Sequence, residues 1–144
     1  MSEEKRCPLV SIVMPAYNAE SWIEASVSSV LSQSWRNIEL IAVNDGSKDG
    51  TGPRLDALAR KDSRLRPIHV ENGGPALARN RGLEALSPES DYVMFIDSDD
   101  ELAEDAVEYA LKGAGSGAEL TVFGFSIISA DGSSRDYQER EQFT

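Results

Sequence analysis

The segment Tyr92-Val-Met-Phe-Ile-Asp-Ser-Asp-Asp-Glu101 passes from a short apolar run directly into a cluster of acidic residues. Short apolar runs that end in polar loops are typical of buried strands in parallel sheets. We therefore predict a buried strand over Tyr92–Ile96, with Asp97 and the acidic residues after it in the loop at its carboxyl end.

The same alternation of apolar runs and polar loops extends along the chain. Leu9–Met14 and Ile38–Val43 predict two further buried strands, and Leu65–Val70 predicts a weaker one because Pro67 interrupts it. Apolar residues at helical spacing lie between the runs. They predict helices containing Ile23–Leu31, Leu55–Ala59, Pro75–Leu86 and Ala103–Leu111. A last strand is expected over Leu120–Ile128, and Asp131-Gly132 is a turn signal for a hairpin.

This order of elements, βαβαβαβαβ, predicts an α/β fold: an open, mainly parallel sheet with helices on both faces. Right-handed crossovers place the strand-end loops along one edge, where ligands bind in such sheets. We expect an N-terminal tail over residues 1–8, one domain over 9–132 and a polar tail over 133–144. Because no closing element follows, we expect the domain to be truncated. Gly82, in the middle of a predicted helix, indicates close packing.

Composition narrows the class of protein. The chain has 144 residues, 40% of them hydrophobic and 27% charged, which fits one globular domain. Its net charge of −11 argues against nucleic acids and anionic membrane surfaces as partners. A single cysteine, Cys7, excludes an intramolecular disulfide, and no apolar stretch is long enough to span a membrane. A cytoplasmic location is the simplest expectation.

Several single residues have ordinary structural interpretations. His69, the one histidine, falls inside the third predicted strand and is expected to be a packed strand residue. Trp22 and Trp35 are interpreted as packing residues. Asn18 is expected to cap the first predicted helix.

Asp97 and Asp99 carry the most specific chemical signal. Their spacing just past a strand lets both carboxylates approach one hard cation such as Mg²⁺. Such an ion lets an acidic protein hold a diphosphate and neutralises charge on a departing phosphate oxygen. The alternative is a solvated loop with an acidic first helical turn, about equally probable for an isolated pair. A calcium-binding EF-hand loop is disfavoured because Leu102 stands where a glycine is needed and because a strand, not a helix, precedes the loop.

Three other loop residues have both a chemical and a structural interpretation. Asp45, in Asn44-Asp-Gly-Ser47, is either a turn residue or an acceptor for a base or sugar group. Tyr17 either packs or stacks on a planar base. Arg79 is either a surface residue or a phosphate contact near the start of the helix that follows Gly73-Gly74. Glycine-rich dinucleotide and P-loop motifs are absent from the sequence, as is the nucleophile elbow of hydrolases.

Taken together, four segments resemble the family 2 glycosyltransferases, whose nucleotide-sugar-binding half has the GT-A fold. They occur in the family's order and spacing, and the resemblance covers roughly residues 9–128. The segments are Val10-Ser-Ile-Val-Met-Pro-Ala-Tyr-Asn18, Ile38-Glu-Leu-Ile-Ala-Val-Asn-Asp-Gly-Ser-Lys-Asp-Gly-Thr51, Gly74-Pro-Ala-Leu-Ala-Arg-Asn-Arg-Gly82 and Tyr92-Val-Met-Phe-Ile-Asp-Ser-Asp-Asp-Glu-Leu102.

The resemblance implies roles for the matching residues. Asp99 would bind Mn²⁺ or Mg²⁺ that bridges the diphosphate, with Asp97 beside the ribose and at the metal. Asp45 would recognise the base, usually uracil. The remaining nucleotide-sugar-binding positions are Pro15, Ala16, Tyr17, Ser98 and Arg79, a frequent arginine of the family.

The resemblance also implies a reaction. Family members transfer a sugar from a nucleoside diphosphate, here expected to be a UDP-sugar, to an acceptor hydroxyl with inversion at the anomeric carbon. A carboxylate deprotonates the acceptor while the metal stabilises the leaving diphosphate. We expect that general base beyond Thr144. The acceptor would be a saccharide or a lipid-linked molecule in cell-surface polysaccharide synthesis, at the inner face of the membrane in the full-length protein.

Two alternatives stay open at this stage. One is a nucleotide-binding module without transfer activity. The other is a phosphotransferase of the haloacid-dehalogenase type, which also has an Asp-x-Asp motif at a strand end. That alternative is weak because it needs an aspartate nucleophile on the first strand, where this chain has Pro15-Ala-Tyr17.

Overall fold

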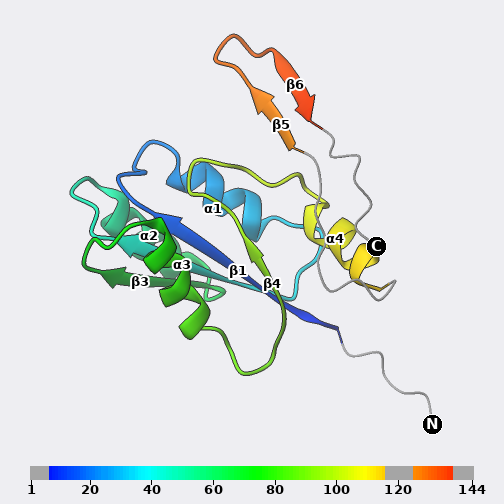
Figure 1. Ribbon diagram of the computed structural model, residues 1–144, viewed down its shortest axis with the longest axis horizontal. Helices are drawn as coiled ribbons and strands as arrows, with labels where there is room; N and C mark the ends of the chain where they lie inside the picture. The colour runs from blue at the N-terminus through cyan, green and yellow to red at the C-terminus, as the bar shows by residue number, and fades with distance from the viewer. Residues whose placement is uncertain (1–6, 116–124, 138–144) are drawn as a thin grey trace. The chain divides into compact units, whose positions relative to one another are not determined.

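The computed structural model describes residues 7–115 and 125–137. The chain forms two compact units, Met1–Ala106 and Val107–Thr144 (Figure 1). The first unit holds the main sheet and three helices. Helix α4 (Ala106–Ala114) begins at the last residue of the first unit. Among the described residues, no helix is both long and apolar enough to cross a membrane.

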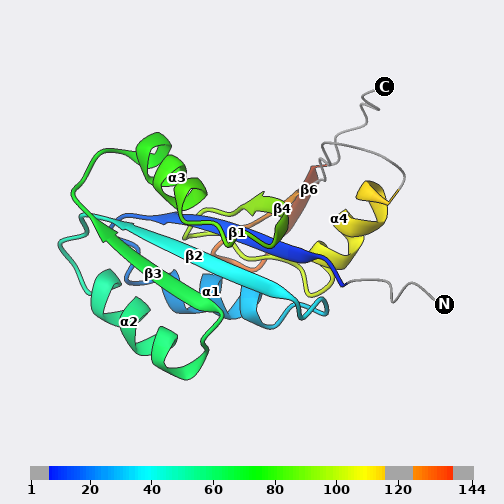
Figure 2. The same ribbon diagram turned by 90° about the horizontal axis from the view of Figure 1, so that it is seen from below.

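The first unit is built on a four-stranded sheet. Its strands are β1 (Leu9–Ala16), β2 (Ile38–Asp45), β3 (Leu65–Val70) and β4 (Ser90–Phe95). They lie in the order β3-β2-β1-β4, and each neighbouring pair is parallel, as predicted. Figure 2 shows α1 (Ile23–Leu31) and α2 (Thr51–Lys61) on one face and α3 (Pro75–Glu84) on the other. All four strands therefore end at the same edge.

The core lies around the two central strands. Every residue of β2 is buried, as is every residue of β1 after Leu9, because helices cover both faces of the sheet. The mid-helix glycine confirms the predicted close packing. A Cβ at Gly82 would lie 2.4 Å from Cγ1 of the buried Val13, so α3 rests directly on β1.

Strand β4 is not buried as the sequence predicted. Tyr92, Val93 and Phe95 are all exposed, and only Ile96 just after the strand is buried. The reason is the position of β4 at the edge of the sheet. Within the described part of the chain it pairs with β1 alone. A dense apolar run therefore marked a strand correctly but did not reveal how much of it is covered.

Two expectations about the start of α1 are also wrong. The helix begins at Ile23, and Trp22 stands at its N-cap position without a side-chain cap. Asn18 instead lies in the preceding loop with a left-handed backbone (φ 47°). Trp22 is 55% exposed because the buried stripe of α1 starts one residue later. Trp35 donates a hydrogen bond from Nε1 to the Pro8 carbonyl (3.1 Å).

The second unit contains a hairpin of β5 (Phe125–Ile128) and β6 (Ser134–Tyr137). Gly132, with φ 82°, lies in the turn, so the predicted hairpin is confirmed. Of the expected strand Leu120–Ile128, only the last four residues lie within the described part. Part of the polar stretch after Ser133 forms strand β6. Pairing with β5, including a hydrogen bond between Ser126 Oγ and Asp136 (2.6 Å), makes part of it a strand.

A buried carboxylate, Glu39, lies near the start of β2, at the end of the sheet opposite to the carboxyl edge. Glu39 of β2 accepts hydrogen bonds from the Ser11 hydroxyl, the Ser87 backbone N–H and Nη1 of Arg66. Burial by itself would raise the pKa of Glu39. The three hydrogen bonds and the charge of Arg66 outweigh burial, so the pKa lies below its ordinary value.

The depressed pKa of Glu39 predicts a pH-dependent contribution to stability. Above the pKa of an unfolded glutamate, near 4.3, the folded state gains the full benefit of the charged form. That benefit disappears as the pH falls through the lower folded-state pKa. Glu39→Gln should therefore cost about 1–3 kcal/mol of unfolding free energy at pH 7.

Urea unfolding of both proteins between pH 7 and pH 3 measures this difference. It should shrink steadily below about pH 4.3. Glu71→Gln, at an exposed position, serves as the control for loss of charge. A difference between parent and Glu39→Gln that does not change with pH would contradict the assignment.

Candidate functional site

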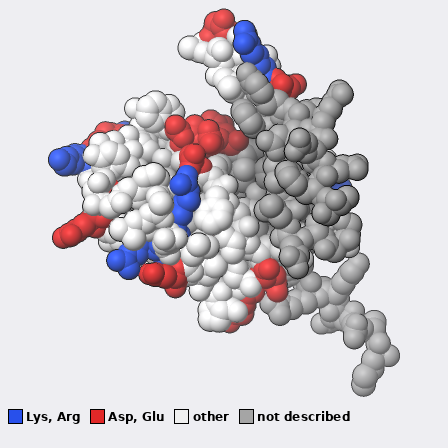
Figure 3. All heavy atoms as spheres, in the orientation of Figure 1, with Lys and Arg blue, Asp and Glu red and all other residues white. Residues whose placement is uncertain are grey.

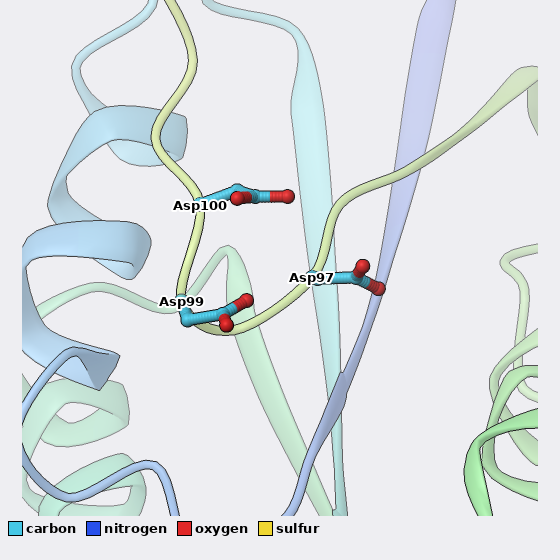
Figure 4. A group of neighbouring side chains, drawn as sticks. All are labelled: Asp97, Asp99 and Asp100. Atoms are coloured by element: carbon cyan, nitrogen blue, oxygen red, sulfur yellow. The ribbon is translucent and has the colours of Figure 1, made fainter. Parts of the chain in front are cut away.

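Three carboxylates gather in the loop after β4. One oxygen from each of Asp97, Asp99 and Asp100 lies within 4.8 Å of the others, and all three residues are exposed. Their side chains point in roughly the same direction (Figure 4). Oxygens that share a Mg²⁺ ion sit about 2.0–2.1 Å from it, so opposite ligands are about 4.2 Å apart. The spacing of these oxygens is therefore compatible with a shared hard divalent cation.

Asp100 is the member of this cluster that the sequence analysis missed. Its pKa lies above the ordinary value because the surrounding chain partly desolvates the carboxyl and because Asp99 and Asp97 repel its charge. The signal was present in the sequence, since Asp100 directly follows Asp99. The predicted pair considered only alternate residues, whereas the turn brings the next residue to the same side.

Arg79 and Asp97, both predicted site residues, are in contact. Nη2 of Arg79 in α3 lies 2.8 Å from Oδ1 of Asp97. The space-filling view shows acidic and basic side chains adjacent to each other on this face (Figure 3). The acidic loop is also held from the other side of the sheet. The Ser26 hydroxyl of α1 donates to the Asp97 carbonyl (3.3 Å), and the Leu102 N–H donates to Ser29 Oγ (3.1 Å).

Asp45 is the last residue of β2 and is only 3% exposed. Its Oδ1 accepts a hydrogen bond from the Gly73 N–H (2.8 Å), and its Oδ2 accepts one from the Gly74 N–H (3.0 Å). The Asn72 amide donates to the Asp45 carbonyl (3.0 Å). These N–H groups immediately precede α3, where the sequence suggested a phosphate contact. The structure shows the Asp45 carboxylate in that place.

The loop after β1 presents the remaining predicted residues. Pro15 and Ala16 are buried at the end of β1, whereas Tyr17 is 50% exposed. The Asn18 N–H donates to Ser47 Oγ (3.0 Å), and the Lys48 N–H donates to Asn18 Oδ1 (2.9 Å). The loops after β1 and β2 thus hold each other in place.

These contacts form one connected edge. The loop after β1 bonds to the loop after β2, and Asp45 bonds to the loop before α3. Arg79 of α3 then pairs with Asp97 after β4. Every predicted site residue lies on this edge, with Ser98 buried between the exposed aspartates. The arrangement joins an exposed aromatic ring, a buried acceptor, a guanidinium and a cluster of three carboxylates that could hold a cation.

The anchoring role of Asp45 can be tested by hydrogen exchange. Asp45→Ala removes both acceptors, so the Gly73 and Gly74 amides should exchange faster, and unfolding should cost about 1.5–3 kcal/mol less. Amide exchange followed by NMR measures the first effect, and urea unfolding measures the second. Glu71→Ala, at an exposed site two residues before Gly73, is the matched control. Unchanged exchange at both glycines would show that Asp45 does not hold this loop.

Comparison with known proteins places this geometry in a family. The family model for glycosyl transferase family 2 matches residues 11–143. A putative teichuronic acid biosynthesis glycosyltransferase, TuaG of Bacillus subtilis, is 39% identical over 131 residues, which are 90% of this chain and 51% of the relative. The chain spans about half or less of the length of the curated relatives it matches.

Two solved structures share the fold. TarS 1–349 of S. aureus, solved in complex with UDP, has a TM-score of 0.66 and 27% identity, over 74% of this chain and 32% of that one. The mannosyltransferase PcManGT of Pyrobaculum calidifontis, solved with GDP-Man and Mn²⁺, has a TM-score of 0.65 and 26% identity, over 75% and 32% respectively. The expected GT-A architecture is confirmed. Because the family model covers nearly the whole chain, the chain belongs to glycosyl transferase family 2.

Proposed function

We propose that this chain binds a nucleoside-diphosphate sugar, most simply a UDP-sugar, through a divalent cation, as the donor for inverting transfer to an acceptor hydroxyl. The observation that carries this proposal is the cluster of Asp97, Asp99 and Asp100 at the carboxyl edge of the sheet, in contact with Arg79. An acidic protein can hold an anionic donor at that edge because a cation and a guanidinium offset the local negative charge.

The nucleoside would bind between the loops after β1 and β2. Tyr17 is exposed enough to stack on a base, and Pro15 and Ala16, at the buried end of β1 just before it, would line the nucleoside pocket. Asp45 would accept a hydrogen bond from the uracil N–H. A carboxylate accepts about four hydrogen bonds, and the contacts with the Gly73 N–H, the Gly74 N–H and the Asn72 amide (3.5 Å) use three of them. Asp45 would therefore recognise the base while it holds the loop before α3.

The diphosphate would lie over the acidic loop. Asp99 would hold Mn²⁺ or Mg²⁺, with Asp97 and Asp100 as the neighbouring carboxylates. When bound, the ion neutralises charge on the leaving diphosphate. Arg79 uses one N–H on Asp97 and has further donors for a phosphate oxygen. Ser98, which is buried in the same loop between Asp97 and Asp99, stays a proposed nucleotide-sugar-binding position.

The relatives support this proposal in outline. TarS is solved with UDP, and PcManGT is solved with GDP-Man and Mn²⁺. The name of TuaG, which places that relative in teichuronic acid biosynthesis, is consistent with our proposal of a role in cell-surface polysaccharide synthesis. The acceptor that we propose is a saccharide or a lipid-linked molecule. We place the reaction in the cytoplasm. The general base and the acceptor site are not assigned to any residue described in this chain.

Metal-coupled nucleotide binding is the test of this function. Calorimetry should show UDP binding in Mn²⁺ or Mg²⁺ and much weaker binding in EDTA. Asp99→Asn replaces a charged oxygen ligand by a neutral one, so affinity in the presence of metal should fall by at least about tenfold. Affinity in EDTA should change little.

Asp105→Asn is the matched control, because Asp105 is an exposed aspartate outside the cluster. It should keep both the parental affinity and its metal dependence. Equal UDP affinity with and without metal in the parent protein would contradict the metal assignment, and absence of UDP binding in both conditions would contradict the function.

A further inference from the structure

His69 is not the simple packed strand residue that the sequence predicted. It lies on β3, with its side chain 45% exposed, and both ring nitrogens have partners. Nδ1 lies 3.0 Å from Nδ2 of Asn44, its register partner on β2. Nε2 lies 2.8 Å from Oδ1 of Asp56 in α2. The ring therefore connects a helix to the end of the strand that carries Asp45.

The hydrogen-bond network selects one tautomer of His69. Oδ1 of Asn44 accepts a hydrogen bond from the Ser47 N–H (3.2 Å), so the Asn44 amide nitrogen faces the ring. An amide nitrogen only donates, and Nδ1 must then be the acceptor without a proton. Nε2 consequently carries the proton and donates to Asp56. A neutral ring in this tautomer satisfies all three side chains.

The start of α2 packs tightly over this pair. A Cβ at Gly52 would lie 2.9 Å from Asn44 Nδ2 and 3.6 Å from Cε1 of His69. Only glycine leaves room for both groups here. The Asn44 amide therefore has little freedom to move away from the ring. Its orientation depends on whether Nδ1 of His69 accepts or donates a hydrogen bond.

Asn44 passes this orientation on to the loops at the carboxyl edge. Its Oδ1 holds the Ser47 N–H, and Ser47 Oγ in turn accepts the hydrogen bond from the Asn18 N–H. Asn18 directly follows Tyr17, and Asp45 lies between Asn44 and Ser47. The contacts from Asp56 through His69 to Asn18 thus reach both proposed nucleoside contacts.

We propose that His69, as the Nε2-protonated neutral tautomer, is a positioning residue for the donor nucleotide. It orients Asn44 and through it the two loops that present Tyr17 and Asp45, which rests on the proposed function of this edge. A second proton on the ring would place an N–H on Nδ1 against the Asn44 NH₂ group. Turning the amide to accept that N–H would deprive the Ser47 N–H of its acceptor.

The groups that face the ring define how a second proton acts. Asp56 of α2 is the charged group that contacts it among the described residues, and β2 presents the uncharged amide of Asn44. Nε2 donates its hydrogen bond to Asp56 whether the ring carries one proton or two. The change on protonation is therefore confined to the side of the ring that faces Asn44 and the nucleotide loops.

The single histidine makes the tautomer directly measurable. The ¹⁵N spectrum of the imidazole at pH 8 should show a proton on Nε2 and none on Nδ1, and its titration gives the midpoint for ring protonation. A ring with the proton on Nδ1 at pH 8 would overturn the proposal, because Asn44 would then face a donor.

Two amide substitutions separate the two ends of the ring. The oxygen of an asparagine side chain stands at the same number of bonds from Cβ as Nδ1, whereas the end of a glutamine side chain corresponds to Nε2. His69→Asn can therefore still accept from Asn44, and His69→Gln keeps only the contact with Asp56. UDP affinity with Mn²⁺ should stay near the parental value in His69→Asn and fall about 3- to 10-fold in His69→Gln.

The pH profile gives a readout that a merely structural role would not change. Parental affinity should fall as the pH drops through the midpoint measured for the ring, and His69→Asn should lack that step. Unfolding midpoints of both variants control for general loss of stability. Equal affinities for the two variants, or a parental step that persists in His69→Asn, would overturn the proposal.

Exchange of the Ser47 and Asn18 amides separates this inference from the function on which it rests. Exchange should be faster in His69→Gln than in His69→Asn, with or without nucleotide. If the parent binds no UDP but the exchange rates differ in this way, the proposed function fails while the positioning of the loops by His69 stands. Equal exchange in the two variants would overturn the positioning role itself.

Discussion

The arrangement of the loops at the carboxyl edge of the sheet depends on the hydrogen bonds of the buried Asp45 carboxylate. A buried charge needs hydrogen-bond partners, and here the backbone N–H groups of Gly73 and Gly74 are among them. They reach Asp45 only if β2 and β3 run parallel and end at the same level. The loop before α3 must also approach the loop after β2 closely. A Cβ at Gly46, which has φ 68°, would lie 2.6 Å from the Asn72 backbone nitrogen. The strand register, these glycines and the start of α3 are thus linked requirements.

The same edge would let a chain of net charge −11 hold the anionic donor that we propose. The acidic residues at this edge lie in two different environments. Asp45 is buried and satisfied by neutral donors, whereas Asp97, Asp99 and Asp100 are exposed and crowded. Partial desolvation and repulsion from Asp99 and Asp97 together raise the pKa of Asp100, and a divalent cation would relieve the repulsion. Arg79, already held by Asp97, adds a positive group beside the cluster.

Local sequence patterns predicted the order of strands and helices correctly. They failed to predict burial and side-chain contacts that depend on residues far away in the sequence. Alternating apolar runs gave the parallel sheet, and parallel strands brought Tyr17, Asp45, Arg79 and Asp97 to one edge. Burial of Tyr92 and Phe95 was mispredicted because composition does not show whether a strand lies at a sheet edge. His69 was misjudged because its partners, Asn44 and Asp56, are separated from it by 25 and 13 residues. Asp100 was missed because its place depends on the turn.

The most direct measurement of the central claim is NMR of the chain with UDP and Mn²⁺, compared with UDP and diamagnetic Mg²⁺. We expect Mn²⁺ to broaden the amide signals of the Asp97–Asp100 loop first. We also expect UDP to shift the signals of Tyr17 and Asp45 in the Mg²⁺ sample. Broadening spread evenly over exposed acidic residues, with Tyr17 and Asp45 unaffected by UDP, would contradict the account, because neither the cation nor the nucleotide would then bind at the carboxyl edge of the sheet.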